Sequence, residues 1–213
     1  MARIKSNGLL TGIIGNLEFA NVKGLQVVKI CKRTNNSGKG TPKQELQRAK
    51  VRLANVFLHG LNQMIRIGYQ KSPRWTPYNE IVSHLISDAM EVTGEDLHVN
   101  YPVIKVSRGE ITPPSIMGCE RTGNLLTINW DPGIKNGISS KNDEVMIIIH
   151  TSAGVSVPYY TPANRQDGRV TVRIPDDAPG PIHAWMFYNN PRREQKESLT
   201  KVSNSVYLGC FEP

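Results

Sequence analysis

The feature that most constrains the fold is a change in the spacing of apolar residues near Tyr101. Before this point apolar residues recur at helical intervals; after it, short runs alternate between apolar and polar residues, as β-strands do. The seven runs are Val103–Ser107, Leu125–Asp131, Glu144–His150, Val155–Tyr160, Arg169–Ile174, Ile182–Tyr188 and Ser203–Gly209. Seven short strands within about 110 residues predict a seven-stranded immunoglobulin/fibronectin-like β-sandwich.

The first 31 residues predict a β-hairpin. Short apolar runs alternate with glycines there, and two candidate strands flank an Asn/Gly turn. Because an isolated hairpin is only marginally stable in water, it should pack on the helices that follow or on a partner chain. We therefore expect an assembly hairpin whose contact residues are Leu17, Phe19, Val27 and Ile30.

Two helices are expected between the hairpin and the sandwich. Thr41 and Pro42 are a typical helix start, and apolar residues then recur at helical spacing to about Ile67, with a bend at Gly60. Thr76-Pro77 repeats the same start, and that helix should stop near Gly94. The predicted fold class is α+β, with a basic hairpin plus a two-helix region over residues 1–100 and the sandwich over residues 101–213.

Positive charge is concentrated in the first third of the chain. Residues 1–70 hold 12 Lys and Arg against only Glu18 and Glu45, whereas the formal net charge of the whole chain is +8. Eight of these basic residues form a predicted contact patch: Lys29, Lys32, Arg33, Lys39, Lys43, Arg48, Lys50 and Arg52. Such a patch favours an anionic partner, which the sequence leaves open between nucleic acid, an acidic protein face and a membrane surface; a solvated basic face is the plain alternative.

No pattern in the sequence indicates catalysis. The five histidines form no HxH, HExxH or HxxxH spacing, no GxSxG elbow occurs, and the glycine-rich segments lack a GK[ST] ending. The three cysteines show no CxxC or CxxH spacing. We therefore expect a protein that is not an enzyme, with no catalytic, cofactor-binding or metal-binding residues and no small-molecule substrate, although an unfamiliar active site would escape this argument.

The N-terminal apolar stretch, Leu9 to Ile14, is short and is interrupted by Thr11 and Gly12. It lacks the small-residue cleavage pattern of a signal peptide, and no window approaches the roughly 20 apolar residues of a membrane span. We expect a protein made in the cytoplasm without a secretory signal and without a membrane span.

Several segments carry a resemblance to a known family. They are the glycine-rich opening with Val22-Lys-Gly24, Thr41 to Lys50 (TPxxxxQRAK), Ile65 to Tyr69, Val106 to Gly109, and Val202 to Gly209 (VSNSVYLG). In these the chain resembles an uncharacterised family of proteins of similar length from Bacteroidetes and their mobile elements. The resemblance implies a hairpin, helices and an immunoglobulin-like sandwich, and it supplies no catalytic residues. Family members usually read Asn-Pro-Arg-Thr-Pro where this chain has Lys39-Gly40-Thr41-Pro42, so a role for that arginine does not carry over.

These features lead to competing functional hypotheses. The leading one is a non-catalytic structural or interaction protein, an auxiliary capsid- or tail-associated component of a phage-like particle, which forms homo-oligomers or binds protein partners and is incorporated into a virion. The alternative is a nucleic-acid-associated protein that binds the phosphate backbone nonspecifically through its basic N-terminal third. An exported adhesin is a third hypothesis, which the missing signal sequence disfavours.

Overall fold

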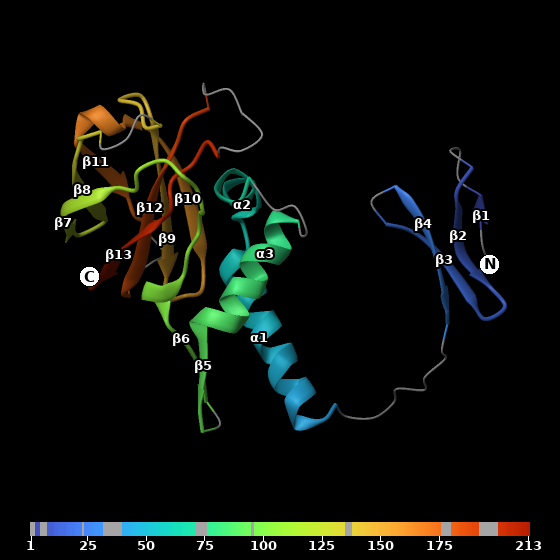
Figure 1. Cartoon of the computed structure of the whole chain (residues 1–213). Coiled ribbons are helices and arrows are strands. Elements are labelled where there is room, and N and C mark those ends of the chain that lie inside the picture. Colours follow the sequence, from blue (N-terminus) through green and yellow to red (C-terminus); the bar gives the residue numbers. More distant parts are fainter. Residues whose placement is uncertain are drawn as a thin grey trace. The chain divides into compact units, whose positions relative to one another are not determined.

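The computed structural model describes residues 3–4, 8–22, 24–31, 40–70, 76–94, 96–134, 138–175, 180–191 and 200–213. The chain forms two compact units, Met1–Thr41 and Pro42–Pro213 (Figure 1).

The N-terminal unit is a four-stranded antiparallel sheet in the order β1-β2-β3-β4. Its strands are β1 (Arg3–Ile4), β2 (Leu10–Ile14), β3 (Leu17–Val22) and β4 (Leu25–Ile30). Tight turns join β2 to β3 and β3 to β4, and Gly15 and Gly24 supply the positive φ (60° and 86°) that two-residue hairpin turns favour. The sheet therefore contains more strands than the predicted hairpin.

Helices begin the second unit: α1 (Pro42–Leu58), α2 (Asn62–Gly68) and α3 (Pro77–His84). The helix predicted to bend at Gly60 is divided there into α1 and α2, and Gly60 has a φ of +79°. Thr76 Oγ1 accepts a hydrogen bond from the Asn79 backbone N–H (3.3 Å), so Thr76 caps α3 as predicted. After α3 come a π-helical turn, η1 (Leu85–Ala89), a hairpin of β5 (Met90–Thr93) and β6 (Asp96–Val99), and a 3-10 turn, η2 (Tyr101–Val103).

Two antiparallel sheets follow. Their strands are β7 (Ser115–Thr122), β8 (Leu125–Asp131), β9 (Glu144–Thr151), β10 (Ser156–Asn164), β11 (Arg169–Arg173), β12 (Ile182–Asn189) and β13 (Val206–Phe211). One sheet has the order β10-β9-β12-β13 and the other the order β11-β8-β7. A buried apolar cluster between them includes Ile128 and Trp130 of β8 together with Ile147 of β9 and Met186 of β12. The second unit thus has a mixed α+β fold in which two sheets share a core.

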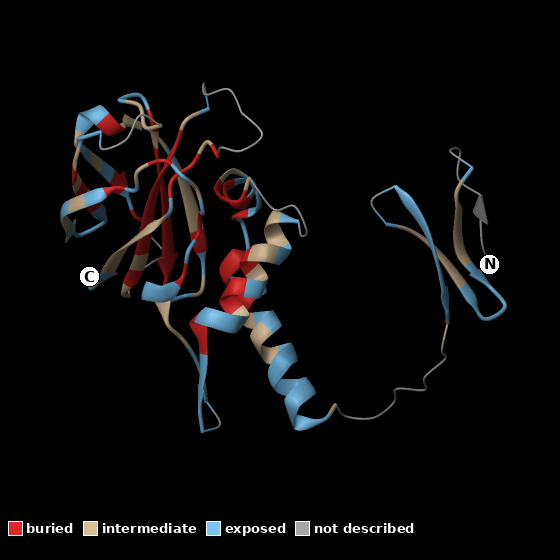
Figure 2. Cartoon of the chain, viewed as in Figure 1, coloured by how far each residue is buried: buried red, intermediate tan, exposed pale blue. Residues whose placement is uncertain are grey.

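The central strands β9 and β12 are buried on both of their faces (Figure 2). Ile147 and Ile149 of β9 point into the core between the sheets, whereas Met146 and Ile148 belong to a second core. Successive side chains of a strand point to opposite faces, so the apolar run from Val145 to Ile149 serves two cores at once.

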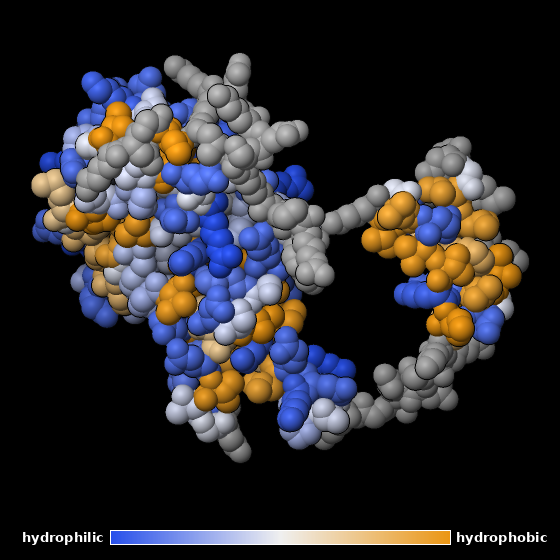
Figure 3. Space-filling model, in the orientation of Figure 1, coloured by the Kyte–Doolittle hydropathy of each residue, from blue (hydrophilic) through white to orange (hydrophobic). Residues whose placement is uncertain are grey.

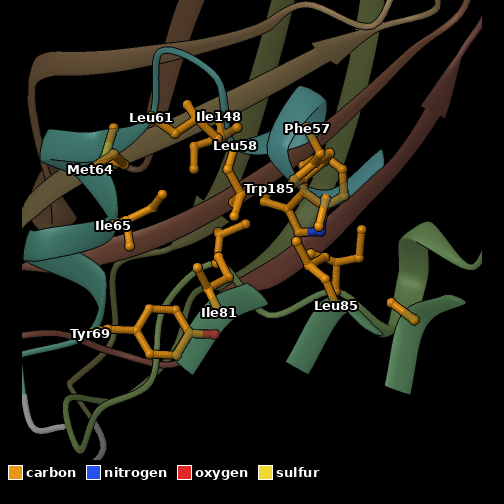
Figure 4. Packing of buried hydrophobic residues seen from close by; sticks show 14 of the residues in the cluster. Phe57, Leu58, Leu61, Met64, Ile65, Tyr69, Ile81, Leu85, Ile148 and Trp185 are labelled. Atoms are coloured by element: carbon orange, nitrogen blue, oxygen red, sulfur yellow. The ribbon is translucent and has the colours of Figure 1, made fainter. Parts of the chain in front are cut away.

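The second core lies between the four-stranded sheet and the helices. Phe57, Leu58 and Leu61 come from α1 and the turn after it, and they meet Ile148 and Trp185 of the sheet (Figure 4). The Phe57 and Trp185 rings make an edge-to-face contact with centroids 5.6 Å apart. The helices therefore form one compact unit with the sheets, and the division in the chain lies at Thr41 rather than near residue 100, where the sequence analysis placed it.

The predicted strand Val103–Ser107 is wrong, and β7 is the strand that the sequence analysis missed. Residues 106–111 pair with the segment before β13 instead: Ser107 Oγ donates to Ser203 O (2.7 Å), and Ile111 N donates to Val202 O (3.1 Å). In β7 a register shift near Gly118 breaks the alternation that marks a strand.

A buried ion pair fastens one end of the sandwich. Arg165 Nε donates to Asp143 Oδ2 (3.1 Å), and the two side chains are 1% and 0% exposed. Asn190 Nδ2 donates to the other Asp143 oxygen (2.9 Å), Arg165 Nη2 donates to Thr112 O (2.8 Å), and the guanidinium lies 3.9 Å from the Tyr188 ring centroid. This network joins the starts or ends of β9, β10 and β12 to the segment before β7.

Because removal of one partner leaves the other charge buried and unpaired, we predict that Arg165→Ala lowers the free energy of unfolding by about 3–5 kcal/mol. Arg169→Ala, at an exposed position of β11, should change it by less than about 0.5 kcal/mol. Urea unfolding followed by tryptophan fluorescence measures both values. Equal effects of the two substitutions would contradict the assigned role of the ion pair.

Candidate interaction surfaces

One face of the N-terminal sheet carries no charge among its described residues and is apolar over two of its rows. Cross-strand partners share a face, so the register places Ile14, Leu17 and Ile30 in one row and Gly12, Phe19 and Val28 in the next; Asn21 and Gln26 form the row beyond them. We call the five apolar side chains of the first two rows the uncharged face. Four of them are 37–66% exposed, and hydrophobic residues dominate the visible surface of this unit (Figure 3).

The opposite face of the sheet is mixed. It carries Val27 and Leu25 together with the ion pair between Glu18 Oε2 and Lys29 Nζ (3.2 Å). The structure therefore brings together three of the four predicted hairpin residues, Leu17, Phe19 and Ile30, and separates them from Val27. None of residues 8–22, 24–31 and 40–41 of this unit is buried.

The Gln26 side chain braces the sheet. Its Nε2 donates to Leu10 O (2.9 Å), and its Oε1 accepts from Leu10 N (3.0 Å), so a side chain of β4 satisfies the backbone of β2. The short hydrogen-bonded ladder between β2 and β3 stops at Gly12, where φ is +111°. The amide of Gln26 therefore holds β2 in place beyond the point where the ladder ends.

The predicted basic patch is divided. Lys32, Arg33 and Lys39 lie outside the described residues, and Lys29 is paired with Glu18 on the sheet. On α1 the four remaining residues occupy two sides: Lys43 and Lys50 are seven positions apart on one side, and Lys50 Nζ donates to Met90 O (3.4 Å). Arg48 and Arg52, four positions apart, share the other side.

Arg48 and Arg52 line an open groove of about 630 Å³ between α1 and the loop that joins β9 to β10. Val51, Val56 and Val155 supply its apolar surface, and His59 lies beyond Arg52 along the same side of the helix. The sequence analysis singled out the two arginines by charge alone. The apolar residues beside them were missed, because Val155 is distant in sequence and the exposure of Val51 and Val56 is not readable from helical spacing.

His84 and Asp88 form a pair that resembles the orienting half of a catalytic triad. His84 Nδ1 lies 2.6 Å from Asp88 Oδ2, and hydrogen bonds from Ser87 and His84 lower the pKa of Asp88. The other ring nitrogen, Nε2, accepts a hydrogen bond from the Lys105 backbone N–H (3.0 Å). A base needs that lone pair to activate a nucleophile, so His84 instead has the geometry of a structural link that joins the end of α3 to Asp88 of η1 and to the segment after η2.

His150 is enclosed by aromatic rings. Its ring centroid lies 4.8 Å from that of Phe57 and 5.6 Å from that of Tyr101. The Ser156 hydroxyl donates to Phe57 O (2.6 Å), so His150 Nδ1–H donates to Ser156 Oγ (2.8 Å). Burial, and then the nearby His183, lowers the pKa of His150 to about 4. His150 is therefore a neutral packing residue near pH 7.

Two features are missing from the described part of the chain. No group of three His, Cys, Asp or Glu residues is placed to hold a metal ion there. None of the helices in those ranges combines the length and the apolar character needed to cross a bilayer.

The pKa of His150 predicts an acid-sensitive stability. Since the folded-state pKa lies below the ordinary value of 6.5, the unfolded chain binds this proton first as the pH falls. The free energy of unfolding should therefore decrease by about 2–3 kcal/mol between pH 6.5 and pH 4. Urea unfolding at several pH values should show a flatter profile for His150→Asn and an unchanged one for His98→Asn, which is exposed on β6. A profile that His150→Asn leaves unaltered would contradict the assignment.

The comparisons with known proteins extend over both units. A family model described as a family of unknown function, DUF6266, matches residues 9–209. None of the curated proteins compared with the chain matches it. The family match begins just before β2 and ends within β13, so it includes the sheet, the helices and the sandwich strands. The chain belongs to this family of unknown function.

Proposed function

We propose that the protein is a non-catalytic assembly protein that associates with a second copy of itself through the uncharged face of its N-terminal sheet. The observation that carries this proposal is the face itself: Ile14, Leu17, Phe19, Val28 and Ile30 form one contiguous apolar surface, and none of residues 8–22 and 24–31 is buried. Exposed apolar patches of this kind mark interaction sites in soluble proteins.

The energetic argument concerns the stability of the sheet. A small sheet depends for its stability in water on an apolar face or on packing against another element. Ile30 is 66% exposed and Ile14 is 53% exposed, so docking of this face removes much apolar area from water. At about 25 cal/mol per Å² that burial contributes on the order of several kcal/mol.

Charge complementarity favours a second copy as the occupant. A charged partner surface would lose its hydration against these five side chains without gaining a counter-charge. The same face of a second chain brings no charge from its described residues. Gly12 has no side chain, so nothing projects from β2 at that position. Two such sheets can pack about 10 Å apart around a two-fold axis, as in sheet-on-sheet packing and isologous dimers.

The surroundings of His84 and His150 support the non-catalytic part of the proposal. His84 Nε2 accepts a backbone hydrogen bond, and the low pKa of His150 accompanies a ring buried among Phe57 and Tyr101. Both are explained by packing and hydrogen bonding within the fold.

We further infer that the sandwich has an immunoglobulin-like topology. Named A to G in chain order, β7, β8 and β11 correspond to strands A, B and E, and β9, β12 and β13 correspond to C, F and G. The remaining strand, β10, is added beside β9, on the CFG side. The Bacteroidetes and mobile-element origin, the phage-like particle and the nonspecific nucleic-acid alternative stay predictions from the sequence.

Two substitutions in β4 test the assembly proposal. Ile30→Lys places a charge on the uncharged face, whereas Leu25→Lys places the same charge on the opposite face at a similarly exposed position (72%). Light scattering over a range of concentrations should show a dimer for the full chain. We expect Ile30→Lys to weaken it about 30-fold or more and Leu25→Lys to leave it within a few-fold.

The same experiment can refute the proposal. A full-length protein that stays monomeric at every concentration, or two substitutions with equal effects, would contradict association through the uncharged face. Circular dichroism of each variant checks that its strands and helices are intact.

A further inference from the structure

A second surface lies entirely within the unit formed by residues 42–213. It is the groove between α1 and the β9–β10 loop, where Arg48 and Arg52 stand beside Val51, Val56 and Val155. Val51, Val56 and Val155 are 37%, 46% and 48% exposed, and they lie together along the groove rather than scattered singly over the surface. The groove thus combines positive charge with apolar surface.

Neither Arg48 nor Arg52 makes an ion pair with a described residue. Among the described residues that line the groove, none is acidic. Two other arginines of this unit have such partners: Arg165 pairs with Asp143, and Arg108 approaches Glu80 (3.8 Å). The groove therefore presents two guanidinium groups whose complement is a carboxylate carried by another molecule.

A cavity of about 200 Å³ adjoins the groove. Leu53, Phe57, Leu85 and Met90 line it, His150 lies at its wall, and both spaces share Val56 and Gly154. Gly154 has a φ of +80°, and a Cβ at this position would lie 3.5 Å from Val56 Cγ1. A side chain at this position would thicken the wall between the groove and the cavity, which glycine leaves thin.

The size and lining of this cavity specify what could fill it. An apolar cavity of about 150 Å³ is large enough to hold a benzene ring. The present cavity therefore has room for one phenylalanine or leucine side chain, and the uncharged state of His150 keeps its wall free of charge. Buried apolar anchors in pockets of this kind carry much of the energy of peptide recognition.

We propose that this groove and cavity together bind an acidic peptide segment of a partner protein, with one large apolar side chain in the cavity and flanking carboxylates on Arg48 and Arg52. A nucleic-acid backbone would satisfy the arginines but would leave Val51, Val56 and Val155 against phosphates. The apolar lining and the adjoining cavity therefore favour the peptide. This site is independent of the dimerisation proposed above, because it uses none of residues 1–41.

The probe is a dye-labelled peptide with a single phenylalanine between glutamates, and the readout is fluorescence anisotropy with the full-length protein. We expect saturable binding that weakens about tenfold or more when the phenylalanine is replaced by alanine, since loss of a buried anchor removes over about 1 kcal/mol. Added salt should also weaken it, because the arginine contacts are electrostatic.

Protein variants locate the site. The double substitution Arg48→Glu and Arg52→Glu should reduce the affinity about tenfold or more. Lys43→Glu, an exposed residue on the other side of α1, should leave the affinity within about twofold, as should Ile30→Lys. A reduction by the double substitution alone supports the proposal, provided that circular dichroism and the urea midpoint are unchanged.

Three results would overturn the proposal: no binding of the phenylalanine peptide, equal binding of the alanine peptide, or no effect of the double substitution. Binding of a duplex DNA fragment in place of the peptide, lost in the same double variant, would also overturn it and would assign the arginines to a nucleic-acid interface. A monomeric wild-type protein would refute the proposed dimer, but the peptide-binding measurements would still test the groove.

Discussion

The structure depends on the burial of one sheet on both of its faces. In β9 and β12 alternate apolar side chains enter two different cores, so the four-stranded sheet needs both a second sheet and a helical layer to cover it. A sandwich that consisted of two sheets alone would leave Ile148, Trp185 and Phe187 in water. The helices are therefore a structural requirement of the sandwich in this chain, which is why the compact unit begins at Pro42.

The sequence predicts most elements that follow the standard periods and misses those that do not. The six later strands were located by alternation, and Thr76 and Gly60 marked a helix start and a helix end. The hairpin of β5 and β6 was missed because Met90 continues the helical spacing of α3, so its first strand reads as the end of a helix. The interaction surfaces were only partly predictable: chain order grouped Lys43, Arg48, Lys50 and Arg52, but helical geometry sends them to two sides of α1.

Three of the five segments that carry the family resemblance, those at residues 65–69, 106–109 and 202–209, meet in space. Gly68 O accepts from Arg108 N (2.9 Å), Val106 N donates to Ser205 Oγ (2.9 Å), and Gly109 N donates to Asn204 Oδ1 (3.2 Å). A Cβ on Gly109 would run into the Val202 carbonyl oxygen, so only glycine allows this approach. These three motifs are explained by architecture, whereas the motif at Thr41 to Lys50 forms the largely exposed start of α1, beside the groove.

Strands β2, β3 and β4 of the N-terminal sheet contain no buried residue, and this has a kinetic consequence. Amides of β9 and β12 lie between two cores, so their hydrogens exchange with solvent only when the whole unit unfolds. Amides of β2 and β4 belong to strands with no core of their own, so local opening is enough to expose them. In the proposed dimer that opening would first require the two sheets to separate. Protection of these amides would then rise with protein concentration, and the sheet's own folding equilibrium would record how much of the protein is assembled.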